Sequence, residues 1–279
     1  MSAARDALTI RPLESAADLH ACVALQDETW GPGFSERVPY AVLWFTRRIG
    51  GILIGAFDGD ALIGFVFGIT GWRDGRPLHW SDMLAVRATT RDRGIGIRLK
   101  QAQRSALLAD GVADVHWTFD PLQSRNAYLN FERLGIVTRT YLRDVYATSD
   151  SPLHHGIGTD RLLAEWRLND ARVQQLADGA RPAPPRLDEL PAVNPVQARG
   201  ALPACARPDL AIDASEVALL IPVDIDRVRR EDLELAREWR ATTRAAFEAY
   251  LGQGFVATRY VRRDERVGAY VLARTRLDA

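Results

Sequence analysis

The stretch at residues 81–100, SDMLAVRATTRDRGIGIRLK, constrains the fold more than any other part of the chain. An apolar strand from Met83 to Val86 leads into a short basic turn, and Gly94 and Gly96 then open an amphipathic helix. Backbone N–H groups at a helix start point outward and carry the positive end of the helix dipole, so they attract anions. Glycine also lets a bulky phosphate approach the backbone closely. The pattern therefore predicts a strand–turn–helix unit that holds a pyrophosphate.

Two common phosphate-binding motifs do not fit this turn. The dinucleotide fingerprint Gly-x-Gly-x-x-Gly needs a third glycine where this chain has Leu99, and the Gly-Lys-Ser/Thr of a P-loop is absent from the sequence. What remains is Arg91-x-x-Gly94-x-Gly96, and the arginines add forked, charged donors at the helix start. The alternative to a phosphate-binding turn is an ordinary strand-to-helix turn without a ligand. The simplest ligand is the pyrophosphate of a nucleotide-containing cofactor, and we expect it to be bound by Arg91, Arg93, Gly94, Ile95 and Gly96.

The string from Arg91 to Gly96 resembles the acetyl-CoA motif of the GCN5-related N-acetyltransferases, the GNAT superfamily. The segment from Ser124 to Gly135 resembles the other signature of that family, an Asn/Ala-rich helix that ends in Leu-Gly. The two signatures occur in the usual order, and the resemblance covers about residues 8–170. It implies an α+β fold with a mixed, mostly antiparallel sheet flanked by helices. The middle strands of that sheet splay apart to hold the pantetheine arm of acetyl-CoA or another acyl-CoA.

Hydrophobic periodicity and turn residues predict an order of elements that matches this family. We expect strands at 8–13, 52–57, 61–69, 79–86, 112–119, 137–147 and 162–168, and helices at 16–30, 38–48, 95–109 and 124–135.

The composition changes after Asp170, and seven prolines lie within residues 179–208. Such a density of proline blocks helices and central strands. Beyond it, the patterns predict a strand at 217–225, a helix at 231–251 and a hairpin of strands at 255–261 and 266–272. The expected parts are therefore a GNAT-like acyl-CoA-binding domain at 8–170, a linker or wrap at 171–214, and a small α+β accessory domain at 215–279. The last domain either closes the substrate pocket or forms a homodimer contact.

The resemblance also implies roles for single residues. The backbone of the central strand contacts pantetheine in this family, which points here to Leu84, Ala85 and Val86, and Asn126 matches an asparagine that hydrogen-bonds the same arm. A tyrosine that often protonates the departing thiolate falls at Phe131, which has no proton to donate. Tyr128 lies three residues earlier, nearly one helical turn away, and serves either as this acid or as a packing residue.

An amine must lose a proton before it attacks a thioester, so a base is needed near the cleft. Asp82 on the central strand is the first candidate, and strand alternation places it on one face with Leu84. Asp120 ends the following strand, where helix entry before Pro121 is the alternative role. His79 begins the central strand, where a surface position is expected rather than a base. A carboxylate half-buried between strands has a raised pKa, which suits this task.

Charge and composition indicate which partners, cellular location and metal sites to expect. The formal net charge is zero, with 36 basic and 36 acidic residues, so we expect neither a nucleic acid nor a membrane as partner. The first residues lack an apolar signal core and the chain has two cysteines, which favours the cytoplasm. The strong excess of arginine over lysine, with much alanine, is typical of a GC-rich bacterial genome. His154 and His155 are adjacent and do not suit one metal, so no metal site is expected.

The resulting prediction is an acetyl-CoA-dependent N-acetyltransferase that acts on a small-molecule amine by direct attack in a ternary complex. Phe131 at the usual tyrosine position motivates the alternative of an acyl-CoA-binding sensor or regulatory protein without catalysis. A GNAT-fold enzyme with different acyl-CoA chemistry is the third possibility.

Overall fold

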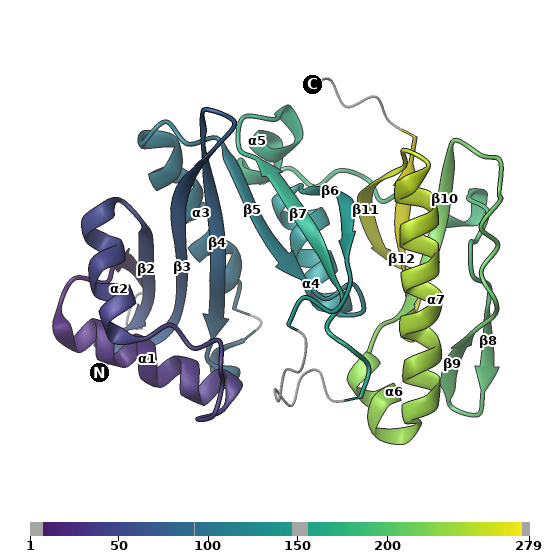
Figure 1. The fold of residues 1–279 in the computed structure, drawn as a ribbon, viewed down its shortest axis with the longest axis horizontal. Coiled ribbons are helices and arrows are strands. Elements are labelled where there is room, and N and C mark those ends of the chain that lie inside the picture. Colours follow the sequence, from purple (N-terminus) through teal and green to yellow (C-terminus); the bar gives the residue numbers. More distant parts are fainter. Residues whose placement is uncertain (1–7, 92, 147–155, 275–279) are drawn as a thin grey trace, which may run out of the picture. The chain divides into compact units, whose positions relative to one another are not determined.

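A computed structural model describes residues 8–91, 93–146 and 156–274 (Figure 1). Its contacts group the described residues into two compact units, the first made of 8–117 and 167–169, the second of 118–146, 156–166 and 170–274. The second signature segment thus groups with the C-terminal third of the chain. This grouping does not coincide with the expected boundaries at residues 170 and 214, and the expected domains stay a prediction.

The first unit contains five strands in the order β1-β2-β3-β4-β5, in which all neighbours are antiparallel except β4 and β5. The strands are β1 (Thr9–Pro12), β2 (Ile52–Asp58), β3 (Ala61–Arg73), β4 (Arg76–Val86) and β5 (Asp114–Phe119), whose last two residues group with the second unit. The helices are α1 (Ala16–Trp30), α2 (Tyr40–Thr46), the 3-10 turns η1 (Arg47–Ile49) and η2 (Ala88–Thr90), and α3 (Ile95–Ala109).

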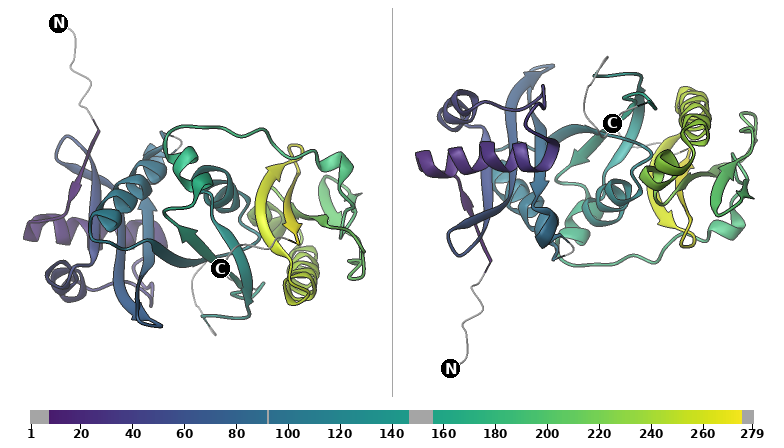
Figure 2. Two further views of the ribbon diagram at one scale, coloured as in Figure 1. Left: turned by 90° about the horizontal axis from the view of Figure 1, so that it is seen from above. Right: turned by 90° about the horizontal axis from the view of Figure 1, so that it is seen from below.

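Helices α1 and α3 lie on opposite faces of strands β2 to β4 (Figure 2). Helix α1 begins with a capping box. The Ser15 side chain accepts a hydrogen bond from the Asp18 N–H, and the Asp18 carboxylate accepts one from the Ser15 N–H. Its apolar residues pack with Met83 and Ala85 of β4 in one buried cluster. On the other face, a Cβ added at Gly96 of α3 would lie 3.9 Å from Leu84 and Val86. From Met83 to Val86, β4 therefore alternates as predicted.

Strand β4 contains a bulge that the sequence did not predict. Phe67 pairs with Met83 and Ile69 with Trp80, so that Ser81 and Asp82 together face Gly68 of β3. Gly68 has to be glycine, because an added Cβ would lie 2.5 Å from the Trp80 carbonyl oxygen. The pairing of β4 with β5 runs from Leu78 to Trp80 and ends there, one residue before the bulge. We call this point, where the partner of β4 on this edge is lost, the fork.

The second unit has five strands in the order β7-β6-β11-β12-β10 and a separate pair, β8 with β9. The strands are β6 (Val137–Leu142), β7 (Arg161–Arg167), β8 (Val196–Arg199), β9 (Leu202–Cys205), β10 (Glu216–Pro222), β11 (Val256–Arg262) and β12 (Val267–Ala273). The helices are α4 (Ser124–Tyr128), which continues as a π-helical turn at Leu129–Leu134, then α5 (Ala171–Ala177), a 3-10 turn at Leu187–Glu189, α6 (Ile225–Glu231) and α7 (Leu233–Gly252).

The predicted α+β class is confirmed, and the sheet is mixed and mostly antiparallel. Several details differ from the prediction. The strands β3 and β4 extend further into their hairpin, and β6 ends five residues before the expected position 147. The segment expected as a linker contains the helix α5 and the pair β8–β9, and the short helix α6 precedes α7. Proline is tolerated in such a two-stranded pair because much of its backbone needs no ladder hydrogen bond.

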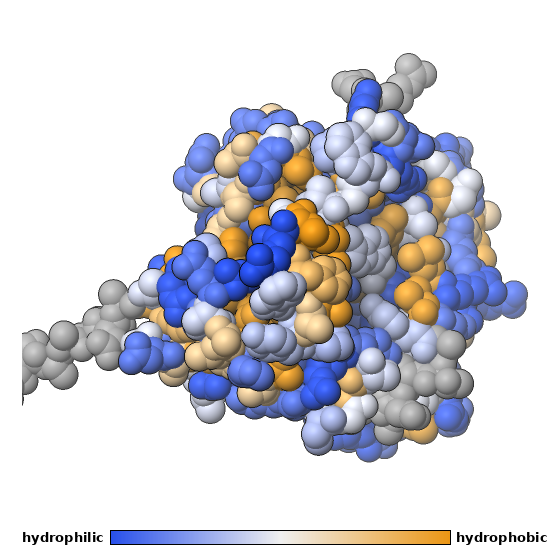
Figure 3. Space-filling model, turned by 60° about the vertical axis from the view of Figure 1, so that its left-hand side comes forward, coloured by the Kyte–Doolittle hydropathy of each residue, from blue (hydrophilic) through white to orange (hydrophobic). Residues whose placement is uncertain are grey.

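Exposed apolar side chains of the first unit gather on α2 and η1, where Trp44 is 45% exposed, Phe45 41% and Ile49 63%. Figure 3 shows hydrophobic residues interspersed with hydrophilic ones on one face of the molecule. Among the described helices, none combines the length and the apolar character that a membrane crossing requires.

Candidate functional site

The turn before α3 leaves the start of the helix open. Gly94 occupies the N-cap position with a φ of 72°, in the left-handed region that glycine adopts without strain, and it offers no side chain to cap the helix. The N–H groups of Ile95 and Gly96 in the first helical turn have no acceptor within the helix itself. This arrangement favours an anion at the helix start.

The two glycines of the turn have free space around them. An added Cβ at Gly96 would make only ordinary contacts, 3.9 Å from Leu84 and from Val86, and at Gly94 the nearest atom is a methyl of Ile97 at 3.7 Å. The φ of Gly96 is not positive, so its backbone tolerates a side chain. The fold itself therefore does not require glycine at position 96.

The arginines of the turn are exposed. The Nε of Arg91 donates to the carbonyl oxygen of Val86 over a long 3.4 Å, and its Nη atoms donate no hydrogen bond among the described residues. Arg93 pairs with Asp58 at 3.3 Å, with half of its side chain exposed. An exposed pair of this kind contributes little to stability, so the Arg93 guanidinium can exchange its partner for a ligand.

Asp82 lies in the bulge of β4 and is exposed, as is Trp80 at 40%. Desolvation by neighbouring protein atoms raises the pKa of its carboxyl, and a hydrogen bond from Trp80 opposes this rise. The direction agrees with the expectation for a general base, because a carboxylate with a raised pKa is a better proton acceptor near neutral pH.

His79 is not the surface residue that the sequence suggested. It is fully buried, with Thr70 Oγ1 at 2.9 Å from Nδ1 and Gln103 Nε2 at 3.0 Å from Nε2. Burial lowers the pKa of His79 to about 3, and the charge of Lys100 adds to this effect. His79 is therefore neutral at physiological pH and has both ring nitrogens engaged.

Asp120, the second base candidate, belongs to the second unit and is only 5% exposed. Arg240 of α7 holds both of its oxygens, at 2.9 and 2.8 Å, and the Leu122 N–H donates to Oδ1 at 2.8 Å. Burial by itself would raise the pKa of Asp120, but Arg240, Arg161 and the Leu122 N–H together lower it. The expectation of a raised pKa is therefore wrong for Asp120, whose carboxylate is occupied by a buried ion pair.

The second signature helix presents its candidates to solvent. Asn126 is exposed and Tyr128 is 47% exposed, both on α4. Phe131, at the usual tyrosine position, is fully buried, with ring centroids 6.2 Å from Phe119 and 5.6 Å from Tyr270. Phe131 is therefore a core residue of the second unit.

The sequence reasoning missed Lys100 as a functional candidate. Lys100 and Gln103 are buried on the inner side of α3, where they join His79 and Ser81 in a polar cluster. The available signal was the position of two polar residues beside the apolar stripe of a helix. That signal is weak, because it does not say what these side chains meet.

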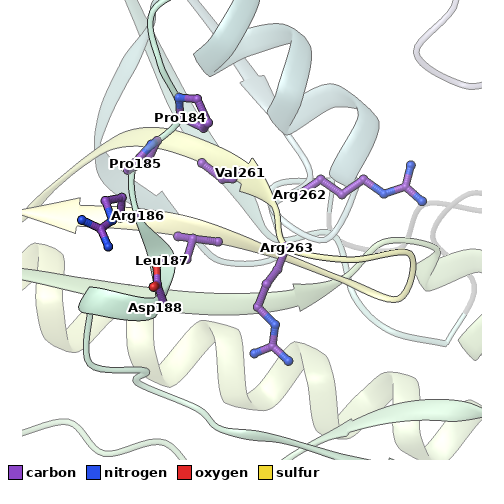
Figure 4. A pocket seen from close by; sticks show the side chains of 8 residues that line it. All are labelled: Pro184, Pro185, Arg186, Leu187, Asp188, Val261, Arg262 and Arg263. Carbon is purple, nitrogen blue, oxygen red and sulfur yellow. The ribbon is translucent and has the colours of Figure 1, made fainter.

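Among the described residues, no group of His, Cys, Asp and Glu could hold a metal ion, and His154 and His155 lie outside the described part. The second unit has a shallow hollow of about 500 Å³ that is lined by prolines and arginines (Figure 4). The arginines at its rim already bond acidic side chains and carbonyls, as in the 2.7 Å pair of Arg186 with Glu189. We assign it no function.

No protein-family model and no curated protein matches the sequence. Solved acetyltransferases are similar in structure. The NatC complex bound to Gag peptide and CoA contains a chain with 17% identity and a TM-score of 0.48, over 58% of this chain and 99% of that one. The ribosomal-protein-S18-alanine N-acetyltransferase from Escherichia coli has 19% identity and a TM-score of 0.46, over 59% and 96%. Aminoglycoside 6'-acetyltransferase type Ii has 16% identity and a TM-score of 0.46, over 59% and 98%.

Proposed function

We propose that this chain transfers an acetyl or other acyl group from acyl-CoA to the amine of a small molecule. One observation carries the proposal: the uncapped start of α3, with Gly94 and Gly96, follows β4 after a short turn, and the edge of β4 loses its strand partner at the fork. A diphosphate at the helix start and an extended arm along the strand edge suit acyl-CoA, which combines both groups.

The cofactor would bind through backbone and arginine donors. The N–H groups of Ile95 and Gly96 receive the pyrophosphate, and Arg91 and Arg93 add charge to the same place. The pantetheine arm runs along the backbone of Leu84, Ala85 and Val86, whose side chains stay in contact with the core or with α3. From Val86 back to Ser81 the strand spans ~17 Å at the usual rise per residue. The arm therefore carries the thioester toward the bulge and Asp82.

In the proposed reaction, Asp82 accepts a proton from the acceptor amine, directly or through one water molecule. The neutral nitrogen attacks the thioester carbonyl, and backbone N–H groups of β4 stabilise the oxyanion. The C–S bond breaks and its electron pair moves to sulfur. The nitrogen, which became positively charged in the attack, releases its extra proton to give the amide, and the thiolate takes up a proton from a proton donor. Tyr128 as that proton donor and Asn126 as a pantetheine ligand stay predictions. Trp80, exposed on the same strand as Asp82, is suited to contact an apolar acceptor.

Calorimetry with CoA tests the binding step. We expect the full chain to bind CoA, with strong losses of affinity for Arg91→Glu and Gly94→Asp, because each places a negative charge at the phosphates. Ser105→Ala, an exposed change in the same helix, is the matched control. Absence of CoA binding by the unmodified chain rejects the proposal. Release of free thiol from acetyl-CoA, measured across a panel of small amines, then tests transfer.

A second function is supported by Phe131. Because this residue is buried among aromatic rings, it neither donates a proton nor faces a ligand at the surface. A sensor that binds acyl-CoA without catalysis accounts for it equally well. Tight CoA binding without thiol release for any amine in the panel favours the sensor. The cytoplasmic location and the homodimer also stay predictions, and sedimentation analysis of the full chain tests the latter.

A further inference from the structure

The only lysine of the chain lies at the fork. Lys100 is 3% exposed, and its Nζ donates to Ser81 Oγ of β4 at 2.7 Å and lies 3.8 Å from the ring centroid of Trp117 of β5. Ser81 and Trp117 each follow directly on the last paired residues of their strands, Trp80 and His116. The ammonium group therefore touches both strands at the point where their pairing ends.

The contacts of Lys100 reach the bulge itself. Ser81 is the first of the two bulge residues that face Gly68. Gln103 Oε1 accepts from Lys100 at 3.1 Å and from the Ser81 hydroxyl at 3.1 Å, while its Nε2 lies 3.0 Å from His79. One side chain of α3 thus holds Ser81 directly, and a second holds both Ser81 and His79. Asp82 is the next residue along the strand.

We propose that Lys100 is a positioning residue for acyl transfer, whose ammonium form holds the β4 bulge, and with it Asp82 and the strand edge, in the shape that receives the thioester. This inference rests on the proposed function, since the bulge matters for catalysis only if acyl-CoA lies along β4. Lys100 acts through Ser81 and Gln103 and needs no contact with the substrate.

The surroundings make the charge of Lys100 sensitive to pH. Burial lowers its pKa to about 7, and the charge of Lys100 in turn lowers the pKa of His79. Besides His79, the titratable groups on the three elements around it are Arg76 and Asp82 on β4, Asp114 and His116 on β5, and Arg98 and Arg104 on α3. When Lys100 loses its proton, the charge-assisted bond to Ser81 and the cation–π contact with Trp117 weaken. Arginine does not fill this role, because it keeps its charge throughout.

Nuclear magnetic resonance can follow this residue alone. Labelling with ¹³C- and ¹⁵N-lysine gives a single side-chain signal, because the full chain has one lysine. We expect this signal to titrate near pH 7 and to shift when CoA is added. A titration near the ordinary lysine value of 10.5 overturns the pH sensitivity of this residue, since burial would then not disfavour the charged form.

Kinetics separates positioning from a purely structural role. We expect the kcat of the unmodified chain to fall as the pH rises through the titration of Lys100, while the KM for acyl-CoA changes little. Lys100→Met should lower kcat at least tenfold and remove this descending limb. Ser81→Ala should lower kcat in the same direction, and the exposed Ser105→Ala should leave it unchanged.

The outcomes distinguish this inference from the proposed function. If the chain neither binds CoA nor releases thiol, the proposed function fails first, and the positioning role falls with it. If the chain transfers acyl groups but Lys100→Met keeps both kcat and the descending limb, only the positioning role is overturned. A lysine signal that titrates near pH 7 yet does not respond to CoA also contradicts it, since CoA would then not reach the fork.

Discussion

Helices α3 and α7 begin in opposite ways. The first turn of α3 follows Gly94 and has no side-chain cap, whereas Asp232 caps α7 by accepting from the Leu235 N–H at 2.9 Å. One carboxylate from each unit shows a similar contrast between an open and an occupied group. Asp82 in the first unit is exposed with a raised pKa, while Asp120 in the second is held by Arg240 with a lowered pKa.

This contrast indicates which polar groups are available to bind a ligand. A group whose hydrogen-bonding capacity is already filled by the protein has little to offer a substrate, and an open donor or an exposed carboxylate has much. The first unit therefore carries the open chemistry that we assign to acyl-CoA. The second unit uses equally polar residues to hold its own segments together, as in the bidentate contact of Arg259 with Glu132 at 2.9 and 2.8 Å.

The largest effect on stability should come from removing the ion-pair partner of Asp120. Arg240→Met leaves Asp120 buried without its main partner, and loss of one member of a buried pair destabilises a protein by about 3–5 kcal/mol. Urea unfolding measures this loss, with Arg263→Met, at an exposed position, as the control. A loss below about 1 kcal/mol, the value typical of exposed pairs, would show that Asp120 is not held as described.

Lys100 should make stability depend on pH in the first unit. Its folded pKa of about 7 lies below the ordinary value of 10.5, so the unfolded chain binds more protons between these values. The burial penalty is fully present below pH 7 and disappears as the pH rises toward 10.5. Lys100→Met should therefore stabilise the protein below pH 7, by roughly 3–5 kcal/mol at most, and progressively less at higher pH.

Denaturant unfolding of both proteins between pH 6 and pH 10 measures this difference. Unpaired hydroxyl and amide groups left at Ser81 and Gln103 reduce the gain but add no slope with pH, because neither group titrates in this range. A difference that stays constant across the pH range contradicts the lowered pKa of Lys100.

The bulge at the fork can be tested by adding one methyl group. Gly68→Ala places a Cβ 2.5 Å from the Trp80 carbonyl oxygen and 2.3 Å from His79 Nε2, so β3 or β4 has to shift. Overpacking of this kind costs about 1–3 kcal/mol. Gly71→Ala in the same strand is the matched control, because a Cβ there meets nothing within 4 Å. Equal stability of the two variants would speak against the bulge.

The smallest effect on stability should come from the open turn. Gly96→Ala adds a methyl that the fold accommodates, and alanine is a better helix former than glycine, so stability should stay equal or rise by up to about 1 kcal/mol. The affinity for CoA should nevertheless fall, by tenfold or more, because the methyl stands where the phosphate approaches. Unfolding and calorimetry on the same samples separate the two effects. Unchanged CoA affinity contradicts a phosphate at Gly96.

Much of the first unit follows from local patterns. The apolar strand, the basic turn and the glycines that open α3 were all predicted from one stretch of sequence, as was the pyrophosphate role that we propose for them. The raised pKa of Asp82 was expected as well. These features succeed because periodicity, capping and turn conformation depend on residues that are close in sequence.

The tertiary structure decided what distant residues do to one another. Asp120 meets Arg240 at a separation of 120 residues, and that contact reversed the expected shift of its pKa. The bulge needs Gly68 opposite Ser81, and Lys100 becomes a candidate only because α3 brings it to the fork. The sequence alone determined which groups are available and how the open turn is built. Which of those groups are buried, paired or left free depends on packing between segments, and no local pattern records it.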